Sequence, residues 1–283
     1  MFVSRREFCQ TALAGTASMF MAAGCSTFCS ACRKPGVAVQ LYSVRGLCQR
    51  DLPGTLKALK AMGYEGVEFA GYYGKSAKEM KQLLDDNGLV AAGTHINAND
   101  LVPGKIEALF DYAEGVGNKY IVCPGGGFKQ GSRNDLMEMA ARFSKAAELA
   151  KPHGIRIGYH NHGNEFRRLF DGKCAWEIFF DACSKDVFTQ LDIGHAHVAG
   201  EDPLFWINRF PGRSVTVHVK ENYKASPSGI LGQNPAAGVP WAKVWPALKA
   251  NGCEWYVVEC ESNAGSLAGV EGCIRYMKSV GEA

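Results

Sequence analysis

Residues 188–220 read FTQLDIGHAHVAGEDPLFWINRFPGRSVTVHVK, and they contain one complete strand–helix–strand unit. Phe188–Asp192 and Val215–Lys220 are short apolar runs of the strand type, and Pro203–Arg209 between them has the composition of a helix. Both apolar runs end in polar side chains. A strand, a helix and a second strand in this order predict a parallel pair, because the helix carries the chain back to the same edge of the sheet.

The same alternation runs from Gly36 to the end of the chain. Apolar runs predict eight strands: Val37–Val44, Gly66–Phe69, Val90–His95, Tyr120–Cys123, Ile155–His160, Phe188–Asp192, Val215–Lys220 and Trp255–Glu259. The segments between them predict helices: Leu56–Met62, Ala77–Asn87, Lys105–Val116, Leu136–His153, Ala175–Cys183, Pro203–Arg209, Trp241–Asn251 and Leu267–Val280. Eight βα units in about 250 residues predict an α/β fold, a single-domain (β/α)8 TIM barrel over residues 36–283.

Composition and charge narrow the class of protein. The chain has 283 residues, of which 47% are hydrophobic and 21% charged, and these proportions exclude disordered, collagen-like and coiled-coil proteins. The formal net charge is only +3. Phosphate neutralisation requires a dense basic field, so a nucleic-acid partner is not expected.

The first residues have the pattern of an export signal. Arg5 and Arg6 precede a run of small apolar residues that ends in Ala22-Ala23-Gly24-Cys25. The run is shorter than the roughly 20 residues of a membrane-spanning helix, and it resembles a bacterial Tat signal followed by a lipobox. We therefore expect residues 1–24 to be a signal, residues 25–35 to be a tether, and the protein to be periplasmic, in contact with the membrane only through a lipid on Cys25.

Cysteine spacing gives little support for disulfides. Cys29 and Cys32 form a single CxxC, without a second CxxC or a nearby His pair, which is a weak signal for zinc or redox chemistry. The other cysteines are scattered through apolar or helical segments and are expected to be small core residues: Cys48, Cys123, Cys174, Cys183, Cys253, Cys260 and Cys273.

Side chains able to bind metals or transfer protons are concentrated at the predicted strand ends, where TIM barrels carry their chemistry. They are Gln40, Tyr42, Glu68, His95, His160, His162, Glu165, Asp192, His195, His218, Lys220, Glu221, Glu259 and Glu261. Carboxylates and neutral imidazoles that converge on one mouth need a compensating cation. A mixed oxygen and nitrogen shell suits Mn²⁺, Co²⁺, Zn²⁺ or Mg²⁺.

One ligand from each of the last four strands gives the expected metal site, Glu165, Asp192, His218 and Glu259. Such a cation would polarise a carbonyl and lower the barrier to removing the proton on the adjacent carbon. The base for that proton is left open among His162, His160, Lys220 and a carboxylate such as Glu68 or Glu259, and His160 is also a possible ligand.

Other polar residues are expected to bind the substrate. His95 and His195 come from neighbouring strand ends and suit hydroxyl groups, and Glu68, Gln40 and Tyr42 are assigned to the same task. Trp241 and Tyr223, in the segments around the seventh strand, are candidates for stacking on a sugar face, with ordinary packing as the equal alternative.

Several of these segments together resemble the xylose isomerase-like TIM-barrel superfamily, in particular its sugar phosphate isomerases and epimerases. The segments are Gln40–Arg45, Gly63–Glu68, Tyr159–His162 with Glu165 and Phe166, Leu191–His195, His218–Glu221 and Val258–Glu259. The resemblance implies a divalent metal on carboxylates and a histidine of the late strands, which correspond to Glu165, Asp192, His218 and Glu259. Many relatives place the first carboxylate within strand five, where this chain has Tyr159 and His160.

The resemblance implies a metal-dependent isomerase or epimerase that removes a proton next to a carbonyl of a small carbohydrate. The alternative is a lyase or hydratase of 3-keto-glycosides, favoured by the export signal because phosphorylated sugars are scarce outside the cytoplasm. A non-catalytic sugar-binding lipoprotein is a further alternative, and a homo-oligomer is compatible with the sequence. The related fold of endonuclease IV is disfavoured because it needs more ligands and a basic groove.

Overall fold

The computed structural model describes residues 34–125, 131–262 and 265–283. The expected signal, Cys25, the CxxC pair and most of the expected tether lie outside these residues. Eight parallel strands form the main sheet: β1 Gly36–Gln40, β2 Gly66–Phe69, β3 Val90–His95, β4 Tyr120–Cys123, β5 Arg156–His160, β8 Phe188–Gln190, β9 Thr216–Val219 and β10 Trp255–Val258. Their order is β8-β5-β4-β3-β2-β1-β10-β9, which is the order of a barrel opened between β8 and β9. The expected single-domain TIM barrel is therefore confirmed.

The ring is closed at the junction of β8 and β9 by a few contacts rather than by a continuous ladder. An isolated parallel bridge joins Asp192 to His218, where His218 N donates to Leu191 O over 3.0 Å. Below it, the Thr189 and Ser214 hydroxyls are 3.0 Å apart. Two residues of the expected metal site thus lie at this junction.

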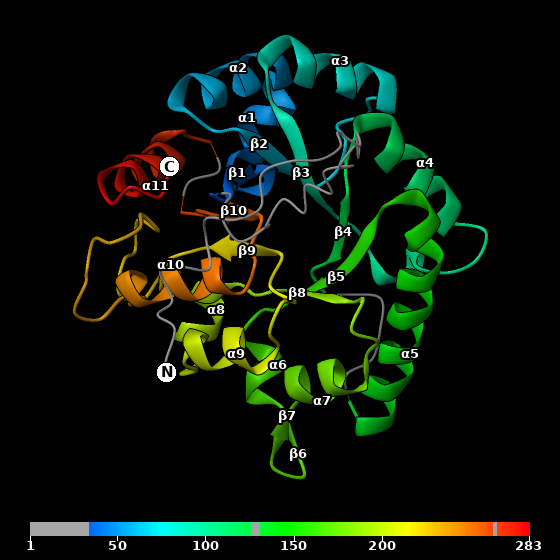
Figure 1. Cartoon of the computed structure of the whole chain (residues 1–283). Helices are drawn as coiled ribbons and strands as arrows, with labels where there is room; N and C mark the ends of the chain where they lie inside the picture. The colour runs from blue at the N-terminus through cyan, green and yellow to red at the C-terminus, as the bar shows by residue number, and fades with distance from the viewer. Residues whose placement is uncertain (1–33, 126–130, 263–264) are drawn as a thin grey trace, which may run out of the picture. The chain divides into compact units, whose positions relative to one another are not determined.

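Helices surround the ring of strands (Figure 1). They are α1 Arg45–Arg50, α2 Leu52–Met62, α3 Ala77–Asn87, α4 Ile106–Val116, α5 Arg133–Ala150, α6 Asn164–Arg167, α7 Ala175–Ala182, α8 Ile193–Val198, α9 Pro203–Arg209, α10 Trp241–Ala250 and α11 Ala268–Ser279. A two-stranded hairpin, β6 Leu169–Phe170 and β7 Lys173–Cys174, lies between α6 and α7. None of the helices in the described ranges is both long and apolar enough to cross a bilayer.

The first strand is shorter than the sequence predicts. The apolar run Val37–Val44 was expected to be one strand, but β1 ends at Gln40 and Leu41–Val44 form a 3-10 helix. The side chain of Gln40 accepts a hydrogen bond from Tyr42 N and so caps that helix. After Gln40 the chain no longer belongs to the sheet, and Tyr42 is 42% exposed.

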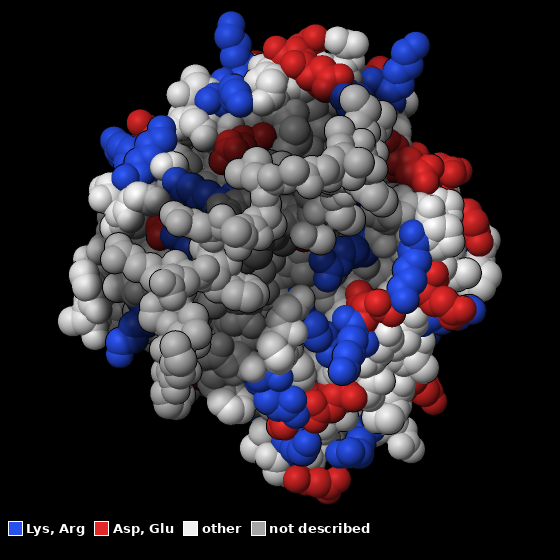
Figure 2. Space-filling view, viewed as in Figure 1, with Lys and Arg blue, Asp and Glu red and all other residues white. Residues whose placement is uncertain are grey.

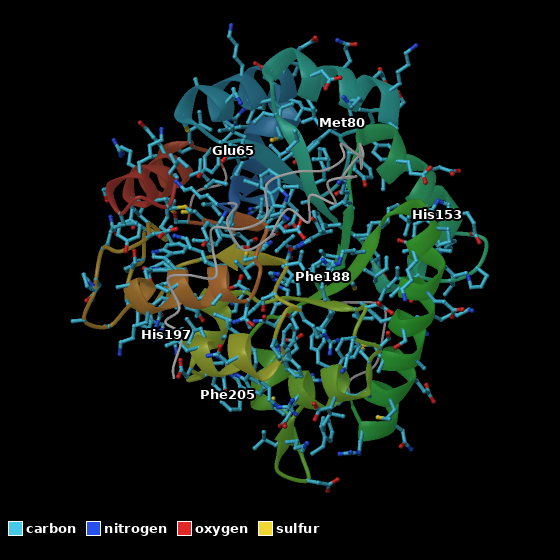
Figure 3. The ribbon with its side chains drawn as sticks, in the orientation of Figure 1. Glu65, Met80, His153, Phe188, His197 and Phe205 are labelled. Atoms are coloured by element: carbon cyan, nitrogen blue, oxygen red, sulfur yellow. The ribbon has the colours of Figure 1, made fainter. Side chains whose placement is uncertain are left out.

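Aromatic rings fill the barrel at the amino ends of the strands. Phe188, Tyr120, Val122 and Val215 form one apolar cluster with Trp255 packed against it, and Phe188 lies inside the ring of strands in Figure 3. Gly158 leaves room for this packing, because a Cβ there would lie 2.5 Å from the Phe188 ring. We refer to this cluster as the barrel base.

The larger core lies between the strands and the surrounding helices, and it contains most of the apolar side chains of both. All seven cysteines of the described residues are free and buried, as expected for small core residues. On the face shown in Figure 2, basic and acidic side chains are interspersed around the described part of the rim.

Candidate active site

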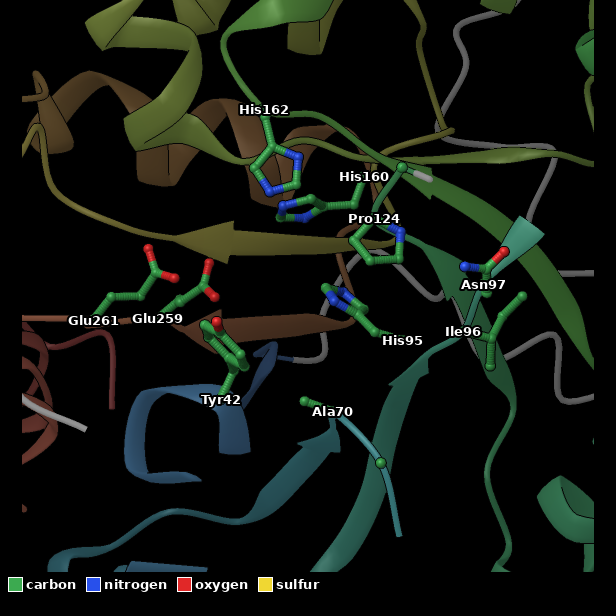
Figure 4. A pocket seen from close by; sticks show the side chains of 12 residues that line it. Tyr42, Ala70, His95, Ile96, Asn97, Pro124, His160, His162, Glu259 and Glu261 are labelled. Atoms are coloured by element: carbon green, nitrogen blue, oxygen red, sulfur yellow. The ribbon is translucent and has the colours of Figure 1, made fainter. Parts of the chain in front are cut away.

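A cavity of about 520 Å³ opens at the carboxyl ends of the strands (Figure 4). Residues from the first strand to the last line it: Tyr42, Ala70, Gly71, His95, Ile96, Asn97, Pro124, Gly125, His160, His162, Glu259 and Glu261. In Figure 4, His95, His160 and His162 point into the same space as the two carboxylates. The barrel therefore gathers residues that are far apart in sequence into one mouth, which we call the main cavity.

Glu68 is fully buried beneath this region, and four side chains contact its carboxylate. Gln40 Nε2 donates to its Oε2 over 2.7 Å, and Gln190 Nε2 donates to its Oε1 over 2.6 Å. His218 Nε2 lies 2.6 Å and His95 Nε2 lies 3.0 Å from its Oε2. This carboxylate holds two imidazoles and two amides in fixed positions.

These contacts determine the protonation states of Glu68, His218 and His160. Burial alone would raise the pKa of Glu68, but the nearby imidazoles of His95 and His218 outweigh burial and lower it well below its usual range. Burial works against the charge on His218, yet Glu68 and Glu259 raise the pKa of His218 to about 10. For His160, burial and the neighbouring His218 and His95 lower the pKa well below its usual value, so this imidazole is neutral with a free lone pair.

Asp192 carries the most informative atom of the site. Its Oδ1 accepts a hydrogen bond from His195 N and caps α8, whereas its Oδ2 is buried with no hydrogen-bond partner among the described residues. His218 Nδ1 and Lys220 Nζ each lie 3.9 Å from Oδ2, and His160 Nε2 lies 4.0 Å from it. A buried carboxylate oxygen without a partner, with these two imidazole nitrogens within 4.0 Å of it, could share a divalent cation with those nitrogens.

Four residues bring ligand atoms within 4.8 Å of one another: His160, Asp192, His218 and Glu259. His218 Nδ1 also lies 3.1 Å from Glu259 Oε2. Two imidazoles and two carboxylates form a donor set that suits Zn²⁺, Mn²⁺ or Co²⁺. The structure therefore contains a group that could hold a divalent metal, and three of its four members are among the ligands expected from the sequence.

Glu165 does not belong to this group within the described residues. Its Oε1 accepts a hydrogen bond from Tyr159 Oη over 2.9 Å, and its Oε2 accepts one from His162 N over 2.9 Å. Tyr159 is part of the core outside the strands, so Glu165 faces that core. The fourth member of the metal-binding group is His160, on the inner side of β5, and not Glu165 as expected from the sequence.

Lys220 lies beside the metal-binding group with its ammonium fully engaged. Its Nζ donates to Glu261 Oε2 over 2.5 Å and to Glu259 Oε2 over 3.2 Å, and it lies 3.1 Å from His195 Nε2. Burial would lower the pKa of Lys220, but Asp192, Glu259 and Glu261 raise it above its usual value. Lys220 is therefore a cation in this arrangement and a poor candidate for the base.

His162 lines the main cavity and is not a member of the metal-binding group. Its ring centroid is 5.0 Å from that of His195. Burial and the nearby His195 lower the pKa of His162, so the imidazole is neutral at pH 7. A neutral imidazole that faces the cavity can accept a proton from a molecule bound there.

The two aromatic residues considered for sugar stacking have different positions. Trp241 is 2% exposed, donates from Nε1 to Glu221 Oε2 over 2.9 Å and stacks on Trp245 at 4.7 Å. Its position corrects the expected substrate contact in favour of packing. Tyr223 is 49% exposed and lies next to a second, smaller cavity.

Two buried polar residues that hold the site together were missed in the sequence. Gln190 donates to Glu68, and its Oε1 lies 2.8 Å from His95 Nε2 and 3.2 Å from His160 Nδ1. Asn161 accepts from Asp192 N over 2.8 Å and donates to Asp192 O over 3.1 Å. A signal for Gln190 was present, since an uncharged polar residue two positions before Asp192 in an apolar strand points to the same side.

The chain resembles known proteins over most of its length. The model of the family described as xylose isomerase-like TIM barrel matches residues 56–280. An inosose dehydratase from Lacticaseibacillus casei is 25% identical over 240 residues, which cover 71% of this chain and 79% of that protein. These findings support an enzyme and leave its specific reaction open.

Solved structures agree with the fold. A crystal structure of a sugar phosphate isomerase/epimerase from Parabacteroides distasonis superposes with a TM-score of 0.75 at 22% identity, covering 86% of this chain and 98% of that one. The IOLI protein, whose structure has a bound zinc atom, superposes with a TM-score of 0.63 at 14% identity, covering 87% and 96%. From its fold, its mouth and the family match, this chain belongs to the xylose isomerase-like TIM barrel family.

Proposed function

We propose that this protein is a divalent-metal-dependent carbohydrate isomerase or epimerase that removes a proton from the carbon next to a carbonyl. The observation that carries the proposal is the Oδ2 of Asp192, which has no hydrogen-bond partner among the described residues and is buried among His160, His218 and Lys220. Of these residues, His160 lines the main cavity. Desolvating a carboxylate oxygen without a partner is costly, so a cation at this point would explain the arrangement.

The residues that would hold the metal are His160, Asp192, His218 and Glu259. When bound, a divalent cation supplies Lewis-acid stabilisation of the negative charge that develops on a carbonyl oxygen as the neighbouring proton leaves. Glu68 would orient His218 through the 2.6 Å contact, as buried carboxylates commonly do for metal-binding imidazoles.

His162 is the proposed base. It faces the main cavity, and its backbone N–H is fixed by the hydrogen bond to Glu165 Oε2. His95 also lines this cavity, and its Nε2 is held by Gln190 Oε1 and Glu68 Oε2, which leaves Nδ1 to accept a hydrogen bond from a substrate hydroxyl. In an isomerisation, the proton removed by His162 returns to the adjacent carbon, whereas an epimerisation requires a second group of the site to deliver a proton to the opposite face of the same carbon.

Elimination is the second candidate, and a specific observation favours it. Lys220 is held as a cation between Glu259 and Glu261, the two carboxylates that line the main cavity, and its positive charge could stabilise the negative charge on a departing oxygen. The inosose dehydratase relative is named for a reaction of this type, which supports a lyase or hydratase acting on a keto sugar or 3-keto-glycoside.

The experiment is proton exchange in D2O with metal-loaded protein. Fructose, ribulose and 3-keto-glucose serve as probes, and deuterium incorporation next to the carbonyl is followed by NMR. We expect exchange that disappears on treatment with EDTA, returns with Mn²⁺, Co²⁺ or Zn²⁺, and falls about a hundredfold or more in His162→Gln. Loss of a water molecule during exchange would assign the lyase reaction. Exchange that survives EDTA would contradict the metal-dependent proposal.

A further inference from the structure

A second cavity of about 240 Å³ adjoins the main cavity on the side of the β9–α10 connection. It is lined by Lys220, Glu221, Tyr223, Pro227, Gly229, Glu259, Cys260, Glu261 and Ser262. Glu259 and Glu261 line both cavities, so these carboxylates form a shared wall. We call the smaller space the side cavity.

We propose that the side cavity binds a second sugar ring, so that the substrate is a glycoside whose reacting ring lies in the main cavity. This inference rests on the proposed function, because it places the reacting carbonyl beside the metal-binding group. It goes further in assigning a site for the part of the substrate that does not react.

The size of the side cavity fits a single ring. A volume of about 240 Å³ equals roughly eight water molecules at about 30 Å³ each. This is below the range of about 300–1,000 Å³ for pockets that hold a whole small-molecule ligand. The space therefore suits an extension of a ligand already bound in the main cavity.

The lining of the side cavity has the chemistry of sugar recognition. Tyr223 offers an exposed aromatic face for the apolar C–H side of a ring, and its exposed fraction of 49% leaves that face available. Glu261 and the hydroxyl of Ser262 offer hydrogen-bond partners for ring hydroxyls. An apolar platform combined with polar groups at its edge favours a hydroxylated ring over a purely apolar ligand.

Buried hydrogen bonds hold the platform in place. Glu221 accepts from Asn222 N, Gly232 N, Val239 N and Trp241 Nε1, each over 2.8–2.9 Å. The connection that carries Tyr223 is thereby tied at several points to one buried carboxylate. Asn222 Oδ1 also accepts from Lys224 N over 3.0 Å, which closes a turn around Tyr223. A platform fixed before binding reduces the entropy lost when the ring docks.

In a ligand that occupies both cavities, the glycosidic linkage would pass the carboxylates that line both, Glu259 and Glu261. A ligand that extends from one cavity to the other crosses Glu261, whose Oε2 holds Lys220 Nζ at 2.5 Å. The linkage oxygen would therefore lie near a cation, which suits both binding of an acceptor oxygen and, for the elimination candidate, its departure.

The test compares one ring with two by isothermal titration calorimetry on Mn²⁺-loaded protein. The probes are glucose, cellobiose and maltose, and the variants are Tyr223→Ala, which removes the platform, and Ser262→Trp, which fills the side cavity. We expect at least one disaccharide to bind about tenfold more tightly than glucose, and each variant to abolish that preference while glucose affinity stays within about twofold. Phe205→Ala is the matched control, because Phe205 is 54% exposed and lines neither cavity.

Equal affinities for glucose and both disaccharides would overturn the inference, as would an equal loss for one ring and two in both variants. If none of the sugars binds while metal-dependent proton exchange is observed, the side-cavity inference fails and the proposed function stands. If exchange itself is absent, the proposed function fails. Melting temperatures of the variants separate these outcomes from misfolding.

Discussion

The two ends of the barrel are built from the same strands and have opposite chemistry. At the base, Phe188 of β8 and Val215 before β9 pack with aromatic rings. A few residues further along the same segments, Asp192 and His218 face each other in the mouth. The base gains free energy from apolar burial, whereas the mouth buries charged groups whose desolvation has to be offset by pairing. Stability and chemistry are thus assigned to opposite ends of each strand.

Asp192→Asn is the substitution that should affect the mouth most and the base least. Asparagine is also a good N-cap, so α8 keeps its hydrogen bond from His195 N, while the charge needed by a cation is lost. We expect bound metal to disappear and proton exchange to fall on the order of ten-thousandfold, about 5.4 kcal/mol in activation free energy. Metal analysis and exchange rates, beside a melting curve close to that of the parent protein, check this.

Phe188→Ala should have the reverse effect. It removes the ring that packs against Tyr120 at 5.9 Å and leaves a void at the base. We expect the free energy of unfolding to drop by about 3–5 kcal/mol, with metal content per folded molecule unchanged. Chemical denaturation measures the first and metal analysis of the folded fraction the second. A loss of metal in folded Phe188→Ala protein would show that the two ends are coupled.

Of the three substitutions, Glu165→Gln should have the smallest overall effect, with small changes in both the stability of the protein and its metal content. If Glu165 supports the mouth from outside, the glutamine keeps an acceptor for one of the two hydrogen bonds, and stability should fall by only about 1 kcal/mol. Metal content should stay near one equivalent. Glu259→Gln, measured beside it, should lose the metal. Equal metal loss in both variants would return Glu165 to the ligand set.

The fold could be predicted because βα alternation is a local pattern repeated eight times. The end of the first strand could not, because it depends on the contact of the Gln40 side chain with Tyr42 N. Apolar composition alone does not distinguish an extended Leu41–Val44 from a 3-10 turn.

The sequence predicted where the candidate site lies and most of its metal-binding residues, but not the positions of Glu165 and Trp241. Asp192, His218 and Glu259 are adjacent in space because strand ends converge, which follows from topology. Glu165 lies in α6, beyond the strand, where the alternation of faces no longer applies, and its direction is decided by Tyr159. Trp241 could not be distinguished from Tyr223 by composition, because its burial depends on the distant partner Trp245 and on Glu221.

The bridge between Asp192 and His218 also has a consequence for how the barrel opens. β8 and β9 meet through this isolated bridge, and both residues of the bridge belong to the metal-binding group. A cation bound by both residues would stabilise the junction between β8 and β9. Metal occupancy would therefore control how often the two strands separate there by local unfolding. The amide hydrogens that donate across this junction, Thr189 N–H to Arg213 O and His218 N–H to Leu191 O, would then exchange with solvent at a rate that reports metal occupancy without any substrate.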